Sequence, residues 1–239
     1  MVTLRERAGG VPAPARRTRK RSSVQLKAVM AVSGAILLLY LVAHMIGNLK
    51  TFFGEESLDA YAAWLRIVGE PALPHGTVLW AVRIVLLVAV IAHIVSATIL
   101  ARRARRARPV RYAHRPPVQT NYAARTMRWG GVIIALFVVY HILDLTTGTL
   151  NPNGVHGEVF DNVTAGFSLW YVTLVYTLAV IAVGFHVRHG LWSGLQTLGF
   201  SSGASQARIK AVALGFAIVL TVGFLSVPFA VQFGLVAPA

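Results

Sequence analysis

The chain has 239 residues, 56% of them hydrophobic, and yet it carries a formal net charge of +15 at pH 7. Its positive mean hydropathy excludes an ordinary soluble domain and indicates a protein embedded in lipid. There is no cysteine, which excludes disulfides, a cysteine-ligated zinc site and a cysteine-held iron–sulfur cluster, so any redox centre must use other ligands.

The N-terminal segment is basic. Residues 5–21 are rich in Arg, Pro and Ala, remain polar for too long to be a signal peptide, and precede an apolar run that no small-residue cleavage site follows. We expect residues 1–24 to form a mobile cytoplasmic tail and residues 25–239 to form a single membrane domain.

Five apolar runs are each long enough to cross a bilayer, which takes about 20 residues of helix. They cover residues 26–49, 77–101, 129–150, 167–195 and 209–233. None of them alternates as a barrel strand would. The sequence therefore predicts an all-α fold, an integral membrane bundle of five transmembrane helices.

The charges of the connecting segments predict the orientation of this bundle. Basic residues gather before the first run, between the second and third, and at the start of the fifth, whereas the other two loops carry the acidic residues. The positive-inside rule then places the N-terminus in the cytoplasm and the C-terminus outside, as a multi-pass protein of the plasma membrane. The arginines also suit contact with anionic membrane lipid. Nucleic-acid binding is not expected, because no aromatic interleaving or nucleic-acid fold accompanies the charge.

Histidines are the main candidates for function. Three of the eight fall in loops and are interpreted as ordinary surface residues: His75, His114 and His156. The other five lie in or at the end of apolar runs: His44, His93, His141, His186 and His189. An ionisable side chain within a membrane is costly and marks a functional candidate, although a single one can simply join two helices.

Depth sorts four of these histidines into two pairs. At a rise of about 1.5 Å per residue, His44 and His141 lie roughly 20–25 Å beyond the basic residues that precede their helices, in the outer half of the bilayer. His93 and His186 lie close to basic residues at the inner ends of their helices. Two facing histidines from different helices can clamp a flat macrocycle and leave no open coordination position, which suits electron transfer. The pairs therefore predict two b-type haems.

Other uses of the histidines remain open. Zinc needs three or four ligands at one depth, and no such cluster is evident. A proton relay would prefer carboxylates along its path, and Asp144 is the only acid within the runs. Several glycines in or beside the runs could admit a porphyrin or serve ordinary helix packing. They are Gly34, Gly47, Gly130, Gly131, Gly184 and Gly190.

Short strings around the histidines give a family resemblance. They are Met30-Ala-Val-Ser-Gly34, His44 followed by Gly47-Asn48-Leu49, His93, Tyr140-His141, and His186 followed by Gly190-Leu191-Trp192. In their order and spacing the chain resembles the cytochrome b membrane subunit of succinate dehydrogenase and fumarate reductase, in its single-subunit form with two haems. The resemblance covers all five apolar runs.

The resemblance implies a role for each histidine. It implies a distal haem on His44 and His141 and a proximal haem on His93 and His186. The family places the last ligand four residues before a Gly-Leu-aromatic triplet, which selects His186 over His189. It also implies a flavoprotein subunit with FAD and an iron–sulfur subunit on the cytoplasmic face, with electrons passing through the haems to membrane quinone. Succinate chemistry would lie on a partner chain.

The sequence departs from the family pattern in two respects. Some fumarate reductases of this type carry an acidic residue linked to transmembrane proton movement where this chain has Gly184, so that property is not carried over. Lys27 and Ala31 stand where related two-subunit anchors have quinone-contacting residues. The quinone contacts are therefore left open.

Four further residues are candidates for contact with a haem propionate or quinone: Arg83, Asp144, Arg188 and His189. Asp144 could handle protons for a distal quinone and Arg83 could pair with a distal propionate, but we favour the simpler interpretation that the two neutralise each other or reach the interface. Arg188 and His189 lie where a proximal propionate would emerge. Two other functions stay open, the di-haem anchor of another dehydrogenase and a histidine-based proton or metal transporter.

Overall fold

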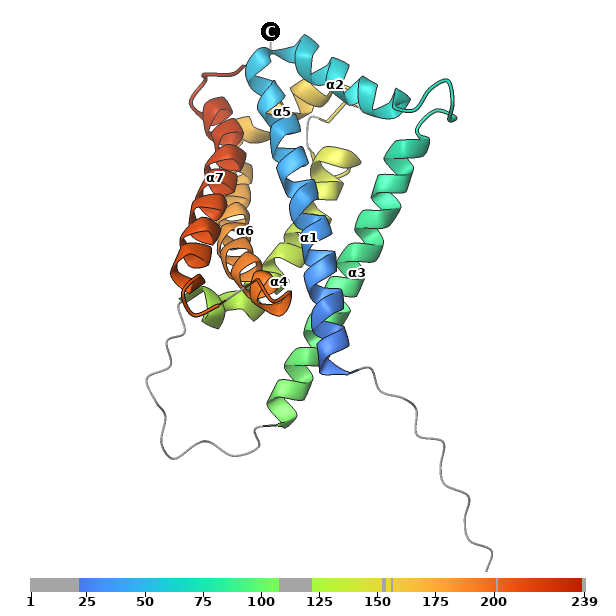
Figure 1. Ribbon diagram of the computed structural model, residues 1–239. Helices are drawn as coiled ribbons and strands as arrows, with labels where there is room; N and C mark the ends of the chain where they lie inside the picture. The colour runs from blue at the N-terminus through green and yellow to red at the C-terminus, as the bar shows by residue number, and fades with distance from the viewer. Residues whose placement is uncertain (1–21, 108–121, 152–153, 156, 201, 238–239) are drawn as a thin grey trace, which may run out of the picture.

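The computed structural model describes residues 22–107, 122–151, 154–155, 157–200 and 202–237. Within these ranges every regular element is a helix (Figure 1). Residues 1–21 of the expected tail, together with His114 and His156, lie outside the described residues.

Five helices are long and apolar enough to cross a membrane, which confirms the predicted all-α membrane bundle. They are α1 (Ser23–Asn48), α3 (Thr77–Arg106), α4 (Tyr122–His141), α6 (Trp170–Thr197) and α7 (Gln206–Gln232). Helix α1 begins where the sequence supplies a cap. The Ser22 hydroxyl accepts from the backbone N–H of Gln25 at 3.1 Å, and the Gln25 side chain accepts from the backbone N–H of Ser22 at 3.0 Å.

Two of the membrane-spanning α-helices continue at their C-terminal ends in helical turns of another type. Helix α1 runs on into a short 3₁₀ helix, η1 (Leu49–Phe53). Helix α4 runs on into a single π-helical turn, η2 (Ile142–Thr146), closed by a hydrogen bond from the N–H of Thr147 to the carbonyl of Ile142 at 2.9 Å. Such π-turns are rare, and they occur frequently at functional sites.

Two short helices lie together at one end of the bundle (Figure 1, top). Helix α2 (Glu55–Ile67) and helix α5 (Val159–Ser168) were not expected, because each is too short to span a bilayer and lies in a segment interpreted as a loop. Asp59 of α2 caps α5: its carboxylate accepts from the N–H groups of Val159 and Phe160 at 3.0 and 3.1 Å. An acceptor at this position satisfies N–H groups that the first turn of a helix cannot pair by itself.

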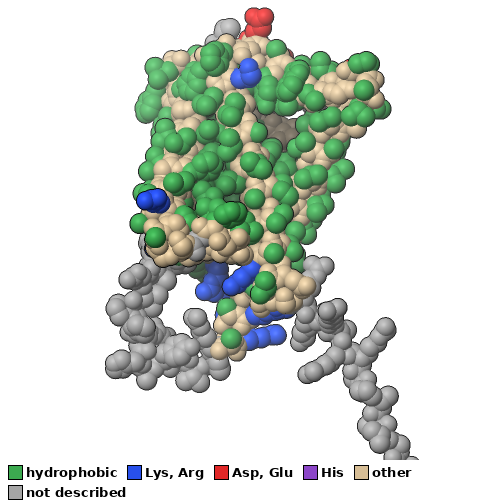
Figure 2. All heavy atoms as spheres, in the orientation of Figure 1, with side chains coloured by type: hydrophobic (Ala, Val, Ile, Leu, Met, Phe, Trp, Pro, Cys, Tyr) green, Lys and Arg blue, Asp and Glu red, His purple; other side chains and the backbone are tan. Residues whose placement is uncertain are grey.

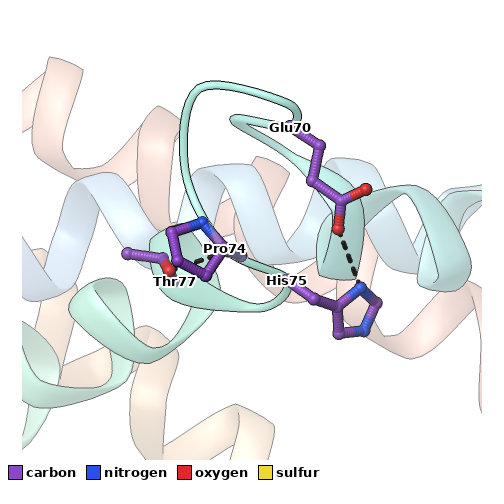
Figure 3. A network of polar contacts seen from close by, with 4 residues as sticks. All are labelled: Glu70, Pro74, His75 and Thr77. Carbon is purple, nitrogen blue, oxygen red and sulfur yellow. Dashed lines mark hydrogen bonds and ion pairs between the residues drawn. The ribbon is translucent and has the colours of Figure 1, made fainter.

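The connection between α2 and α3 carries the described loop histidine. His75 Nδ1 lies 2.9 Å from Glu70 Oε1, and the hydroxyl of Thr77 donates to the carbonyl of Pro74 at 2.8 Å (Figure 3). The side chain of His75 is 66% exposed. This position agrees with its interpretation as an ordinary surface residue.

Helix packing leaves α3 at the margin of the bundle. Helix α1 packs against α3, α4 packs against α6, and α6 packs against α7. Helices α6 and α7 approach closely at Gly184, where a Cβ would collide with the hydroxyl of Thr221. Helices α1 and α7 meet at Gly223, where a Cβ would collide with Met45. Small residues allow such close approach between membrane helices.

The surface of the bundle is apolar along its sides. Figure 2 shows hydrophobic side chains over most of the visible face, and most of the visible Lys and Arg side chains gather toward one end. Large apolar side chains such as Leu39, Leu87 and Leu136 are well over half exposed. Exposure of this extent is untenable in water and is expected for a surface that contacts lipid. The chain is therefore a multi-pass membrane protein.

Candidate functional site: two histidine pairs between the helices

Four membrane histidines meet in two pairs inside the bundle. His44 of α1 faces His141 of α4, with ring centroids 5.7 Å apart and an angle of 78° between the ring planes. His93 of α3 faces His186 of α6, with centroids 6.1 Å apart and an angle of 59°. These are the same pairs that the depth of each histidine predicted.

The two pairs lie at different depths. His44 is near the C-terminal end of α1 and His141 is the last residue of α4, so this pair lies toward the end that carries α2 and α5. His93 and His186 lie in the second halves of α3 and α6, which run toward the opposite end. Each pair joins two helices that are separated in the sequence.

The spacing of each pair suits a metal ion held between the rings. Two imidazoles bound to opposite sides of one ion, with metal–nitrogen bonds of about 2 Å, have ring centres roughly 6 Å apart. The measured separations of 5.7 and 6.1 Å agree with this value. Across the described residues, no group of three or more His, Asp or Glu side chains gathers as a metal site.

His93 is held by one turn of α1. Its Nδ1 lies 3.1 Å from the carbonyl oxygen of Met30 and 3.4 Å from the hydroxyl of Ser33. Since a carbonyl can only accept, Nδ1 carries the proton and Nε2 is left free to bind a metal. A Cβ on Gly34 would lie 3.2 Å from Cε1 of His93, so glycine makes room for this ring.

His141 is held by a different device. Its Nδ1 lies 3.2 Å from the hydroxyl of Tyr176, and that hydroxyl donates to Oδ2 of Asp144 at 2.8 Å. The hydroxyl of Tyr176 has a single proton, which it uses in the hydrogen bond to Asp144. Toward His141 the phenol oxygen can therefore only accept, and Nδ1 of His141 must carry the donated proton. As at His93, Nε2 is the nitrogen left free.

The second histidine of each pair, His44 or His186, is surrounded by different groups. His44 stacks on Tyr40 at 5.3 Å and lies 5.9 Å from the ring of Phe224. His186 Nδ1 is buried with no hydrogen-bond partner, and a Cβ on Gly131 would lie 3.9 Å from its Cε1. Buried polar atoms normally find a partner, but His186 lacks the hydrogen bond that His93 and His141 each make through Nδ1.

His189 does not take part in either pair. Its ring lies 5.5 Å from that of Trp192, and its Nδ1 is likewise buried without a partner. Arg188 beside it is half-buried. The ring that faces His93 is that of His186, and the choice of His186 over His189 as a haem ligand stays a prediction.

The interpretation that Arg83 and Asp144 neutralise each other is wrong. Asp144 is only 2% exposed and takes its hydrogen bond from Tyr176. Arg83 is exposed on α3, and its guanidinium lies over the ring of Trp80 at 4.9 Å. The π-helical turn η2 begins directly after His141 and carries Asp144 at its centre, inside the bundle.

Sequence reasoning missed the groups that hold the histidines. Met30 and Ser33 belong to a string that was noticed only as a family mark, and the structure gives that string a physical role. Tyr176 passed as an apolar residue of its run. A hydroxyl inside an apolar run at the depth of His141 was the available signal, because such a group needs a partner there.

Fold and site together define a multi-pass helical membrane protein with two half-buried histidine pairs. The family model of the succinate dehydrogenase/fumarate reductase transmembrane subunit matches residues 101–225, more than half of the chain, and the chain belongs to this family. No match is found among curated proteins or among solved structures. The matched region includes His141 and His186, and His44 and His93 precede it. The chain is thus a membrane anchor subunit of an oxidoreductase complex of this class.

Proposed function

We propose that this chain is the single-subunit, di-haem anchor of a succinate:quinone oxidoreductase and carries electrons from an iron–sulfur subunit to membrane quinone. A distal haem b would be held by His44 and His141, and a proximal haem b by His93 and His186. The observation that carries the proposal is the pair of histidine contacts at two depths, with ring separations of 5.7 and 6.1 Å.

One histidine of each pair is held by a hydrogen bond to a group on another helix. The Met30 carbonyl contacts Nδ1 of His93, and the Tyr176 hydroxyl contacts Nδ1 of His141, so Nε2 of each ring would be the atom that binds iron. When bound, haem iron with two imidazoles would supply a one-electron carrier without a position open to oxygen. The apolar sides of the bundle keep water away from both pairs.

Sidedness follows from the distribution of charge. Arg103, Arg105 and Arg106 end α3, and Arg208 and Lys210 begin α7, at the end nearer the His93–His186 pair. The positive-inside rule places this end in the cytoplasm, with the C-terminus outside the plasma membrane. The iron–sulfur and FAD-containing subunits would dock there, so that electrons enter at the proximal haem. Arg188 and His189 would lie near its propionates.

A reduced-minus-oxidised visible spectrum of the purified complex, with haem counted per chain, tests this proposal. Two b-type haems per chain, partly reducible by succinate, are expected. A preparation that is folded and colourless with its partners bound would contradict the haem assignment and leave the family membership in place. A colourless chain without partners would favour a histidine-based transporter. Co-purified subunits of another dehydrogenase would identify a different anchor; membership of the succinate dehydrogenase/fumarate reductase family speaks against that outcome.

A further inference from the structure

A buried hydrogen-bond chain runs from the π-helical turn to one member of the His44–His141 pair. Asp144 Oδ2 accepts a hydrogen bond from the Tyr176 hydroxyl at 2.8 Å. The hydroxyl oxygen of Tyr176 in turn lies 3.2 Å from Nδ1 of His141. The chain joins η2 and α6 to the imidazole at the end of α4.

The tyrosine at the centre of this chain is rigidly placed. Tyr176 is 5% exposed, and its ring meets Phe137 and Phe167 edge to face at 5.0 and 4.8 Å. Edge-to-face contacts of this kind fix the orientation of both rings. The hydroxyl of Tyr176 therefore has little freedom to turn toward another partner.

The carboxylate at the end of the chain is also placed at a cost. Asp144 is 2% exposed within a membrane-spanning segment, where an acidic side chain is expensive and marks function. The π-turn that carries it is a local departure from the α-helix, and such turns are frequently kept at functional sites. A packing role alone would be served better by an apolar residue in an unbroken helix.

We propose that Tyr176 and Asp144 are positioning residues of His141, acting as a hydrogen-bond chain that fixes its tautomer and strengthens its Nε2 as an iron ligand. The inference rests on the proposed function, since it takes His141 as a ligand of the distal haem. A hydrogen bond from the outer nitrogen of a metal-bound imidazole raises the basicity of the ligand, and a negative group at the end of the chain raises it further. A stronger donor stabilises ferric over ferrous iron and so lowers the reduction potential of that haem.

The other pair provides an internal reference. His93 donates from Nδ1 to the carbonyl oxygen of Met30, a neutral acceptor on the backbone. Substitutions in the Asp144–Tyr176 chain leave that contact untouched. They are therefore expected to act on the distal haem alone.

The test is a spectroscopic redox titration of the purified complex, together with the rate of haem loss to a haem-scavenging protein. Tyr176→Phe keeps the ring and its packing but removes the link to His141. We expect the distal potential to rise, distal haem to be lost about 10–100-fold more readily, and the proximal haem to be unchanged. Asp144→Asn removes the charge but keeps an acceptor oxygen, so a smaller shift in the same direction is expected.

Tyr140→Phe is the matched control. The ring of Tyr140 lies 5.9 Å from that of Tyr176, so it is close to the same histidine. Its hydroxyl takes no part in the hydrogen bonds that connect Asp144, Tyr176 and His141. An unchanged distal potential and haem retention in Tyr176→Phe would overturn the inference, as would an equal shift in Tyr140→Phe. A wild-type complex without haem would refute the proposed function itself, whereas two haems with an unresponsive distal haem would refute only this inference.

Discussion

Replacing Gly34 by alanine tests how tightly α1 holds His93. The added Cβ would lie 3.2 Å from Cε1 and 3.5 Å from Nδ1 of His93. Ordinary carbon–carbon contacts are about 3.5–4.0 Å, so the ring must retreat by a few tenths of an ångström. That movement is opposed by the hydrogen bond from Nδ1 to Met30, which is already 3.1 Å long. Overpacking of this kind costs about 1–3 kcal/mol.

The expected result is a selective weakening of the proximal haem. If that cost falls on the haem-bound state, the affinity for haem drops about 5- to 150-fold, since about 1.4 kcal/mol is a factor of ten. Transfer of haem from the complex to a scavenger protein, followed by visible spectroscopy, measures this loss for each haem separately.

Gly131→Ala is the matched control for this experiment. Its Cβ would lie 3.9 Å from Cε1 of His186, which is an ordinary contact, and any gain in helix propensity is common to both variants. We expect both haems to be retained. Retention of the proximal haem in Gly34→Ala, or an equal loss in Gly131→Ala, would refute the reasoning.

Three further changes probe the fold and the choice of ligand. Asp59→Ala removes the cap on α5 and should lower the stability of the complex by about 1 kcal/mol in thermal unfolding, while Asp59→Asn, which keeps an acceptor, should lose less. Gly184→Ala should destabilise the α6–α7 contact by about 1–3 kcal/mol because its Cβ meets the hydroxyl of Thr221. Adding Thr221→Ala should restore the melting temperature, and an unrescued double variant would contradict this packing. The number of haems per chain should stay at two in His189→Ala and fall to one in His186→Ala. The reverse result would make His189 the haem ligand in place of His186.

The spans and the histidine pairs could be predicted because they follow from rigid geometry. A bilayer demands long apolar runs, and a helix has a fixed rise, so the depth of His44, His93, His141 and His186 can be calculated from sequence position. The ends of the helices differ from the ends of the predicted runs. Helix α3 continues to Arg106, and the fourth run is interrupted at Leu169, between α5 and α6.

The polar contacts within the bundle could not be predicted in the same way. Sequence spacing on an ideal helix gives no sign of the π-turn that follows His141, so Asp144 was expected to pair with Arg83 or to reach the interface, and its contact with Tyr176 was missed. The short helices α2 and α5 were missed because their segments are too short and too polar for the hydropathy signal. The two helices are joined by hydrogen bonds from Val159 and Phe160 to Asp59. These residues are separated from Asp59 by 100 and 101 positions in the sequence, too far for local patterns to predict the contact.

The pairing of the four histidines is the central claim, and single alanine variants test it most directly. Purified complexes carrying His44→Ala, His141→Ala, His93→Ala or His186→Ala would be compared by redox titration of their visible spectra. The same haem should be missing from the first two variants, and the other haem from the last two. Loss of the same haem from His44→Ala and His93→Ala would contradict the pairing.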